Sequence, residues 1–97
     1  MMASCLFLGC SRRDEDHYSR LGVNYLNNGQ HNYAIDAFKK AVILNPSSAE
    51  AHFNLGRAFK RKGVDEQAKS EFSISHRLNP GKYNEYVKKY REKIDYE

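Results

Sequence analysis

The chain has 97 residues, of which 40% are hydrophobic and 29% are charged, and its formal net charge is +4. This length suits one domain with a thin hydrophobic core. The composition excludes a membrane bundle and a collagen-like chain, and the two cysteines, Cys5 and Cys10, are too few for a disulfide framework.

Residues 1–14 begin with an apolar segment, MMASCLFLGC, which is followed by Arg12 and Arg13. This segment is too short to cross a bilayer, which takes about 20 residues, but it matches the apolar region of a secretory signal. The stretch from Leu6 to Cys10 resembles the end of a bacterial lipoprotein signal, in which a small residue precedes the lipid-bearing cysteine. The resemblance implies lipidation of Cys10 and anchoring in an envelope membrane. We prefer this to the alternative, an unprocessed tail on a cytoplasmic protein.

The two central segments, residues 15–48 and 49–82, repeat each other with a shift of 34 residues. Identical residues occur in the pairs Leu21/Leu55, Gly22/Gly56, Gly29/Gly63, Ala34/Ala68, Phe38/Phe72, Leu44/Leu78, Asn45/Asn79 and Pro46/Pro80. Tyr25 and Phe59 form a conservative match. A fixed period of this length indicates a stack of similar supersecondary units.

Each repeat unit predicts two helices. Apolar residues recur at helical spacing on both sides of Gly29 and of its equivalent in the second unit, where a helix end needs a residue that tolerates positive φ. Proline ends the second helix of each unit, and Ser47 and Glu50 have the spacing of a capping box for the next helix. Gly22 and Gly56 fall inside helices, which predicts that a neighbouring helix approaches closely at both places.

The last segment, residues 83–97, predicts one amphipathic helix. Its apolar stripe consists of Tyr83, Tyr86, Val87, Tyr90 and Ile94. We expect this helix to cap the last repeat; the alternative is a stripe that binds a partner or a second copy of the chain. The predicted fold is therefore all-α, an α-solenoid of two helical hairpins plus a C-terminal capping helix.

The repeat pattern resembles that of the tetratricopeptide repeat (TPR) family, in which an aromatic residue is followed by Leu-Gly, Tyr, Ala, Phe, Ala and Pro. The first unit fills these places with Tyr18, Leu21, Gly22, Tyr25, Ala34, Phe38, Ala41 and Pro46. The second unit fills them with Leu55, Gly56, Phe59, Ala68, Phe72 and Pro80. It departs from the pattern at His52 and Ser75, which replace the aromatic residue and the second alanine. The resemblance covers residues 15–82 and implies helix pairs whose first helices line a concave groove.

The TPR resemblance also implies which residues meet a partner in that groove. The implied positions are Asp16, Ser19, Val23, Leu26 and Asn27 in the first unit and Glu50, Phe53, Arg57, Lys60 and Arg61 in the second. Helical spacing alone places Phe53 on one face with the cations Arg57, Lys60 and Arg61. An aromatic ring beside three cations suits an extended peptide that carries an acidic group. The alternative is that these cations only complement the helix dipole before Gly63.

The expected function is that of a protein-interaction adaptor, which captures a partner segment in the groove. Small lipoproteins of this repeat class act in envelope assembly, such as pilus or secretion-system biogenesis, so the resemblance implies such a role. The alternatives are a structural fragment of a longer TPR array and weak RNA binding through the basic residues 57–62, although this patch is a small footprint for nucleic acid. Solenoids usually need about three repeats, so either self-association or truncation from a longer array is expected.

Catalysis is not indicated by any motif. The histidines, His17, His31, His52 and His76, have no metal-ligand spacing to one another or to a cysteine, so we expect surface histidines and no metal. There is no phosphate-binding glycine loop and no nucleophile motif, so neither a cofactor nor an enzyme is predicted. The carboxylate clamp of chaperone-binding relatives is excluded, because Ser19 and Val23 stand where that clamp needs Lys and Asn.

Overall fold

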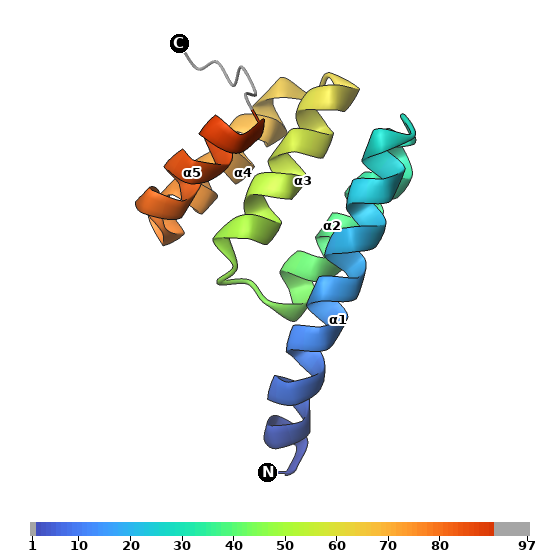
Figure 1. Cartoon of the computed structure of the whole chain (residues 1–97), viewed down its shortest axis with the longest axis vertical. Helices are drawn as coiled ribbons and strands as arrows, with labels where there is room; N and C mark the ends of the chain where they lie inside the picture. The colour runs from blue at the N-terminus through green and yellow to red at the C-terminus, as the bar shows by residue number, and fades with distance from the viewer. Residues whose placement is uncertain (1, 91–97) are drawn as a thin grey trace.

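The protein is a stack of α-helices (Figure 1). The computed structural model describes the backbone of residues 2–90 and the side chains of residues 14–90. The helices are α1 (Met2–Asn27), α2 (His31–Leu44), α3 (Ala49–Lys62), α4 (Asp65–Leu78) and α5 (Pro80–Tyr90). No strand occurs between residues 2 and 90. The predicted fold class, an all-α, TPR-like helical-repeat solenoid, is confirmed.

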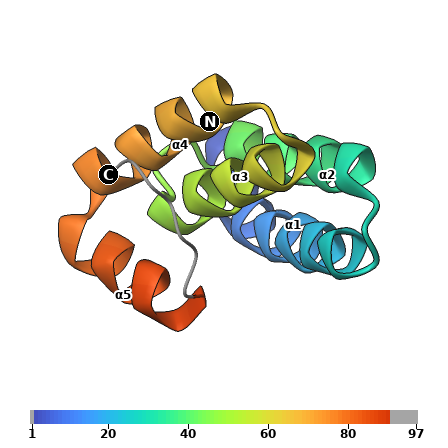
Figure 2. The same cartoon turned by 90° about the horizontal axis from the view of Figure 1, so that it is seen from above.

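Consecutive helices pair as hairpins, α1 with α2 and α3 with α4, and α3 also packs along α2. Seen from above (Figure 2), α1, α3 and α5 form one curved layer and α2 and α4 form a second layer on its outer side. We call the surface of the first layer the inner face, because it carries the helices that line the groove in the predicted fold. α1 has 26 residues against 14 in α2, so its N-terminal part extends beyond the hairpin (Figure 1).

The helix ends follow from turn chemistry. Gly29 and Gly63 have φ angles of 78° and 94°, in the left-handed region that glycine adopts without steric cost. Ser48 caps α3, because its Oγ accepts a hydrogen bond of 3.1 Å from the Ala51 N–H. The capping box predicted from Ser47 is therefore wrong by one residue, since Ser48 is the extended residue directly before the helix.

Asn79 alone separates α4 from α5 and caps both helices. Its backbone N–H donates to the Ser75 carbonyl oxygen at 3.1 Å, and its Oδ1 accepts from the Lys82 N–H at 3.1 Å. Pro80 follows as the first residue of α5, where its missing N–H leaves no helical bond unmade. The last helix therefore begins at Pro80, earlier than the predicted residue 83, and Ile94 lies outside the described residues.

Gly22 and Gly56 bring the two helices of each hairpin close together. A Cβ at Gly22 would lie 2.5 Å from Phe38 Cε1, and a Cβ at Gly56 would lie 2.7 Å from Phe72 Cε1. Both phenyl rings are buried in the core. The predicted close approach is confirmed, and these glycines are needed for space.

Replacing Gly56 by alanine should lower the free energy of unfolding by about 1–2 kcal/mol, because overpacking costs about 1–3 kcal/mol and the gain in helix propensity returns only about 1 kcal/mol. Gly81→Ala is the matched control. A Cβ there would meet only Asn79 Oδ1, at 3.7 Å, so stability should stay unchanged or rise. Urea unfolding compares the two variants, and equal stabilities would contradict the close-packing argument.

Candidate functional site

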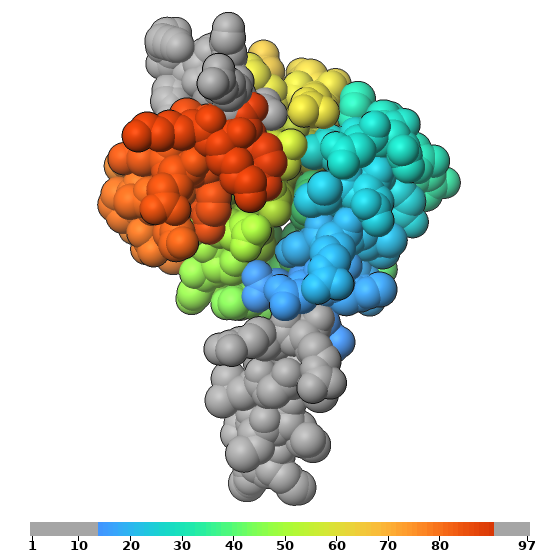
Figure 3. All heavy atoms as spheres, viewed as in Figure 1, coloured from blue at the N-terminus to red at the C-terminus, as the bar shows by residue number. Residues whose placement is uncertain are grey.

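A cleft opens on the inner face between α1, α3 and α5. It is lined by Ser19, Arg20, Val23 and Asn24 of α1, Glu50 and Asn54 of α3 and Tyr90 of α5, and its volume is about 250 Å³. The four residues of α1 share one helix face, since positions four apart lie above one another. In the space-filling view, the surface of α3 is visible between α1 and α5 (Figure 3). The cleft is smaller than a small-molecule pocket, which usually measures about 300–1,000 Å³, and its size suits one or two side chains of a partner.

The first-unit positions implied by the TPR resemblance fall into three groups. Ser19 and Val23 line the cleft. Asp16 and Asn27 are exposed on α1. Leu26 is only 2% exposed and belongs to the core. The role of these residues in partner binding stays a prediction.

Phe53 lies at the centre of an aromatic cluster. Its side chain is 0% exposed, and its ring centroid lies 5.3 Å from that of Phe72, 5.6 Å from Tyr83, 5.3 Å from Tyr86 and 5.9 Å from Tyr90. The three tyrosines belong to α5, so α5 lies over the groove-facing side of α3. A partner segment can reach the Phe53 ring only if α5 moves.

Arg57 is enclosed in the same way. It is 5% exposed, its guanidinium carbon lies 3.9 Å from the centre of the Tyr90 ring, and its Nη1 donates to Asn54 Oδ1 at 3.3 Å. The contact with the ring is a cation–π interaction. Lys60 is half-buried and Arg61 is exposed near the end of α3. Of the predicted aromatic and cationic face, Phe53 and Arg57 are thus buried, whereas Lys60 is half-buried and Arg61 is exposed.

The phenol of Tyr86 has a shifted pKa. Burial first, and the carboxylate of Glu50 second, raise the pKa of the Tyr86 phenol above its ordinary value of 10.0, with smaller contributions from Glu85, Tyr90 and Glu15. The phenol is therefore neutral at physiological pH. The Tyr86 phenol ionises at a lower pH in the unfolded chain than in the folded protein. Its contribution to the free energy of unfolding is therefore lost as the pH rises from the ordinary tyrosine pKa through the raised one.

Sequence reasoning did not identify part of the cleft lining, namely Arg20, Asn24, Asn54 and Tyr90. Arg20 and Asn24 directly follow Ser19 and Val23, so the full width of the α1 face would have included them. Tyr90 holds the repeat position of Gly22 and Gly56. A tyrosine at a place that otherwise admits a neighbouring ring indicates that the packing of the last helix differs.

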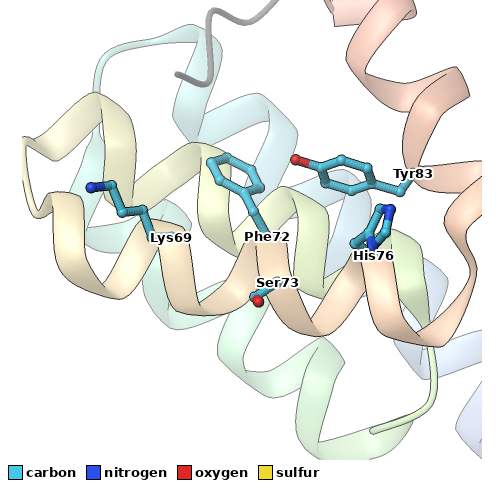
Figure 4. Close-up of a pocket in the computed structure, with 5 residues that line it drawn as sticks. All are labelled: Lys69, Phe72, Ser73, His76 and Tyr83. Atoms are coloured by element: carbon cyan, nitrogen blue, oxygen red, sulfur yellow. The ribbon is translucent and has the colours of Figure 1, made fainter. Parts of the chain in front are cut away.

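A second cavity lies between α4 and α5 (Figure 4). It is lined by Lys69, Phe72, Ser73, His76 and Tyr83, and its volume is about 400 Å³. Tyr83 reaches from α5 towards Phe72 and His76 (Figure 4), and the rings of His76 and Tyr83 meet edge to face at 5.2 Å. The cavity exists because α5 lies less closely along α4 than α3 lies along α2.

His52 joins α3 to α4 and to the loop before α3. It is 7% exposed, with Nε2 2.9 Å from the Pro46 carbonyl oxygen and Nδ1 2.7 Å from Glu71 Oε1. A carbonyl oxygen only accepts, so Nε2–H donates to it, and Nδ1 faces the Glu71 carboxylate. The predicted surface position of His52 is wrong, because the residue replaces a core aromatic and bonds to two inward-facing acceptors.

Ser75, the other departure from the TPR pattern, is also bonded. Its side chain is 0% exposed, and its Oγ donates to the Ala49 carbonyl oxygen at 2.8 Å. Glu71 and Ser75 are neighbours on one face of α4. Both departures from the pattern therefore tie α4 to the beginning of α3.

A protein-family model described as TPR repeat matches residues 22–63. The match supports assignment to the TPR family, whose repeats generally mediate protein–protein binding and are typically non-enzymatic scaffolds. Comparison with curated proteins gives no match. The helical-repeat fold and the family match support a general role as a protein-interaction scaffold.

The described residues show neither a membrane-spanning helix nor a metal-binding cluster. Within them, no helix combines the length and apolar character needed to span a membrane. They also contain no group of three or more His, Cys, Asp or Glu side chains that could hold a metal ion. The side chain of Cys10 lies outside the described side chains, so its lipidation stays a prediction.

Proposed function

We propose that the protein is an adaptor that captures a segment of a partner protein in the inner cleft between α1, α3 and α5. The observation that carries this proposal is the lining of the cleft: Ser19 and Val23, at positions implied by the TPR resemblance, line it together with Glu50 and Asn54. Val23 offers apolar contact. Asn24 lines the same wall, and amide side chains supply the donors and acceptors that a partner backbone requires.

The character of α4 supports a stand-alone adaptor over a piece of a longer array. α4 exposes Lys69 and His76 at the places where α2 has Ile35 and Val42, and Ile35 is buried in the core. Polar side chains on the last unit of a stack are typical of a terminal repeat. RNA binding is less well supported, because Arg57 of the basic patch is enclosed by Tyr90.

A photo-crosslinking residue at Val23 should form adducts with a small set of partner proteins in the native host. The matched control is the same residue at Lys39, which is exposed on α2 in the outer layer and should not give these adducts. Arg20→Glu should reduce the Val23 adducts, whereas Arg77→Glu, exposed on α4, should not. Identical adducts from both crosslinking positions, or none from Val23, would contradict capture in the cleft.

The partner segment is further proposed to carry an acidic group. Lys60 and Arg61 supply positive charge near the end of α3, where an anionic side chain would make charge-assisted hydrogen bonds. Lys60→Glu should then lower the yield of the Val23 adducts. An unchanged adduct yield would contradict the acidic group on the partner segment, but it would not contradict capture of the segment in the cleft.

Anchoring through a lipid on Cys10 and a role in envelope assembly are also proposed, on the resemblance of Leu6 to Cys10 to a lipoprotein signal. The intact mass of the mature protein from its native host tests the anchor, on which the role in envelope assembly depends. A mass that begins at Cys10 and includes acyl chains supports the anchor. A mass that retains the N-terminal methionine and carries no lipid overturns it.

A further inference from the structure

α5 covers the part of α3 that faces the groove. Its tyrosine rings lie on Phe53, and the Tyr90 ring lies on the Arg57 guanidinium. α5 lies more closely along α3 than α3 lies along α1, and less closely along α4 than α3 lies along α2. It is therefore not placed as the first helix of a third repeat would be. It is displaced towards the inner face, where Figure 2 shows α1 and α5 on either side of α3.

Tyr90 shows what this displacement achieves. Its repeat equivalents, Gly22 and Gly56, lie against the second helix of their own hairpins. The Tyr90 ring instead stacks on Phe53 at an interplanar angle of 29° and on Arg57 at 3.9 Å. The same residue lines the open cleft. Tyr90 thus separates the cleft from the covered aromatic surface beside it.

The contacts of α5 are few in comparison with those of the helix that it covers. Among the 11 residues of α5 only Tyr83 is buried, whereas ten of the 14 residues of α3 are buried. A helix of this length is marginal on its own, and Asn79 is the single residue between it and α4 in the chain. The surface beneath it is built by α3 and α4, which bring the rings of Phe53 and Phe72 to 5.3 Å.

We propose that the face of α3 beneath α5 is a docking surface for an amphipathic partner helix with aromatic residues at i, i+3 and i+7, and that α5 occupies this surface until the partner displaces it. The spacing is that of Tyr83, Tyr86 and Tyr90. Aromatic side chains at these places would contact Phe53, and the last of them would present its face to Arg57. This inference rests on the proposed function and specifies the kind of segment that the groove accepts.

A peptide in trans tests this directly on the full chain. The probe is a fluorescent peptide with the sequence of residues 80–90, and the variant carries Tyr86→Ala with Tyr90→Ala, which loosens α5. While α5 is bound, the apparent affinity for the peptide equals the intrinsic affinity multiplied by the fraction of molecules in which the surface is open. Loosening α5 raises this fraction, so the variant should bind the peptide about tenfold more tightly than the natural chain. Fluorescence anisotropy measures both affinities. Arg57→Ala in the loosened variant should weaken binding again.

A control peptide in which the three tyrosines are replaced by serine should not bind. Equal affinities of the natural and loosened chains, or of the two peptides, would overturn the proposal. Should circular dichroism show that the loosened variant has lost most of its helix content, Asn79→Gly replaces it, because this change removes the side-chain cap of α5 and leaves every contact residue in place. The Asn79→Gly variant should then also bind the peptide more tightly than the natural chain does.

Two more outcomes separate this inference from the function on which it rests. The inference would be overturned if the natural chain sedimented as a dimer in which the two copies exchange α5. A second copy of the chain would then occupy the face of α3 beneath α5. Adducts at Val23 do not depend on displacement of α5. Adducts at Val23 without peptide binding would therefore leave the adaptor function standing and remove the docking surface.

Discussion

Replacing Phe53 by alanine is expected to lower the free energy of unfolding by about 3–5 kcal/mol. The ring is 0% exposed and touches Phe72 of α4 and three tyrosines of α5. Its removal leaves a cavity that the backbones of three helices cannot close. A small domain has a total stability of about 5–15 kcal/mol, so the variant should be close to unfolding at room temperature. Urea denaturation followed by circular dichroism measures the loss.

Two variants control for this experiment. Ile43→Ala removes a large apolar side chain that is 74% exposed, and it should change stability by no more than about 0.5 kcal/mol. Phe53→Leu keeps most of the volume and should cost less than the alanine variant. If Phe53→Ala were as mild as Ile43→Ala, the ring would not be part of the core and α5 would not lie over it.

Replacing His52 by phenylalanine should destabilise the protein by about 1–3 kcal/mol, even though the change restores the aromatic residue of the repeat pattern. The substitution removes the hydrogen bonds to the Pro46 carbonyl and the Glu71 carboxylate. Both acceptors are then left without this donor in a partly buried place. Thermal unfolding of the variant beside the natural chain gives the magnitude.

A double-mutant cycle isolates the interaction of His52 with Glu71. When both partners become apolar, in His52→Phe with Glu71→Leu, the carboxylate no longer has to be desolvated without a partner. The double variant should therefore be more stable than His52→Phe alone, with an interaction energy of about 0.5–3 kcal/mol. Additive effects would show that the 2.7 Å contact contributes nothing to stability.

The two hairpins could be predicted from the sequence because local and periodic signals agree. Gly29 and Gly63 both have the positive φ that their places at helix ends predict. Gly22 and Gly56 both make room for a phenylalanine of the opposite helix. Because each of these signals occurs in both repeat units, the assignment of one unit supports that of the other. The α1 wall of the cleft could be predicted in part, through Ser19 and Val23.

The position of α5 could not be predicted in the same way. An apolar stripe indicates that a helix covers something, but its spacing does not show which neighbouring helix it covers. α5 has no repeat equivalent with the same residues, because Tyr90 replaces the glycine. Phe53 and Arg57 were expected on an open face, and their burial depends on where α5 lies.

The burial of the two polar residues that depart from the repeat pattern could not be predicted from the sequence either. The period identifies His52 and Ser75 as unusual, but a polar side chain at such a place can point inwards only if acceptors are present there. The acceptors are backbone carbonyls of Pro46 and Ala49 and the carboxylate of Glu71. Folding brings these groups together from separate elements, so spacing along the chain does not reveal them.

The pairing of each helix mainly with its neighbours in the chain also determines how the protein folds. Contacts between elements close in sequence need little loop closure, so a low contact order and folding within about microseconds to milliseconds are expected. Stability is then shared between adjacent units. Amide hydrogen exchange should therefore be fastest in α5, slower in α1 and α2, and slowest in α3, which contacts all the other helices. Part of the molecule would thus open and close many times before the whole chain unfolds once.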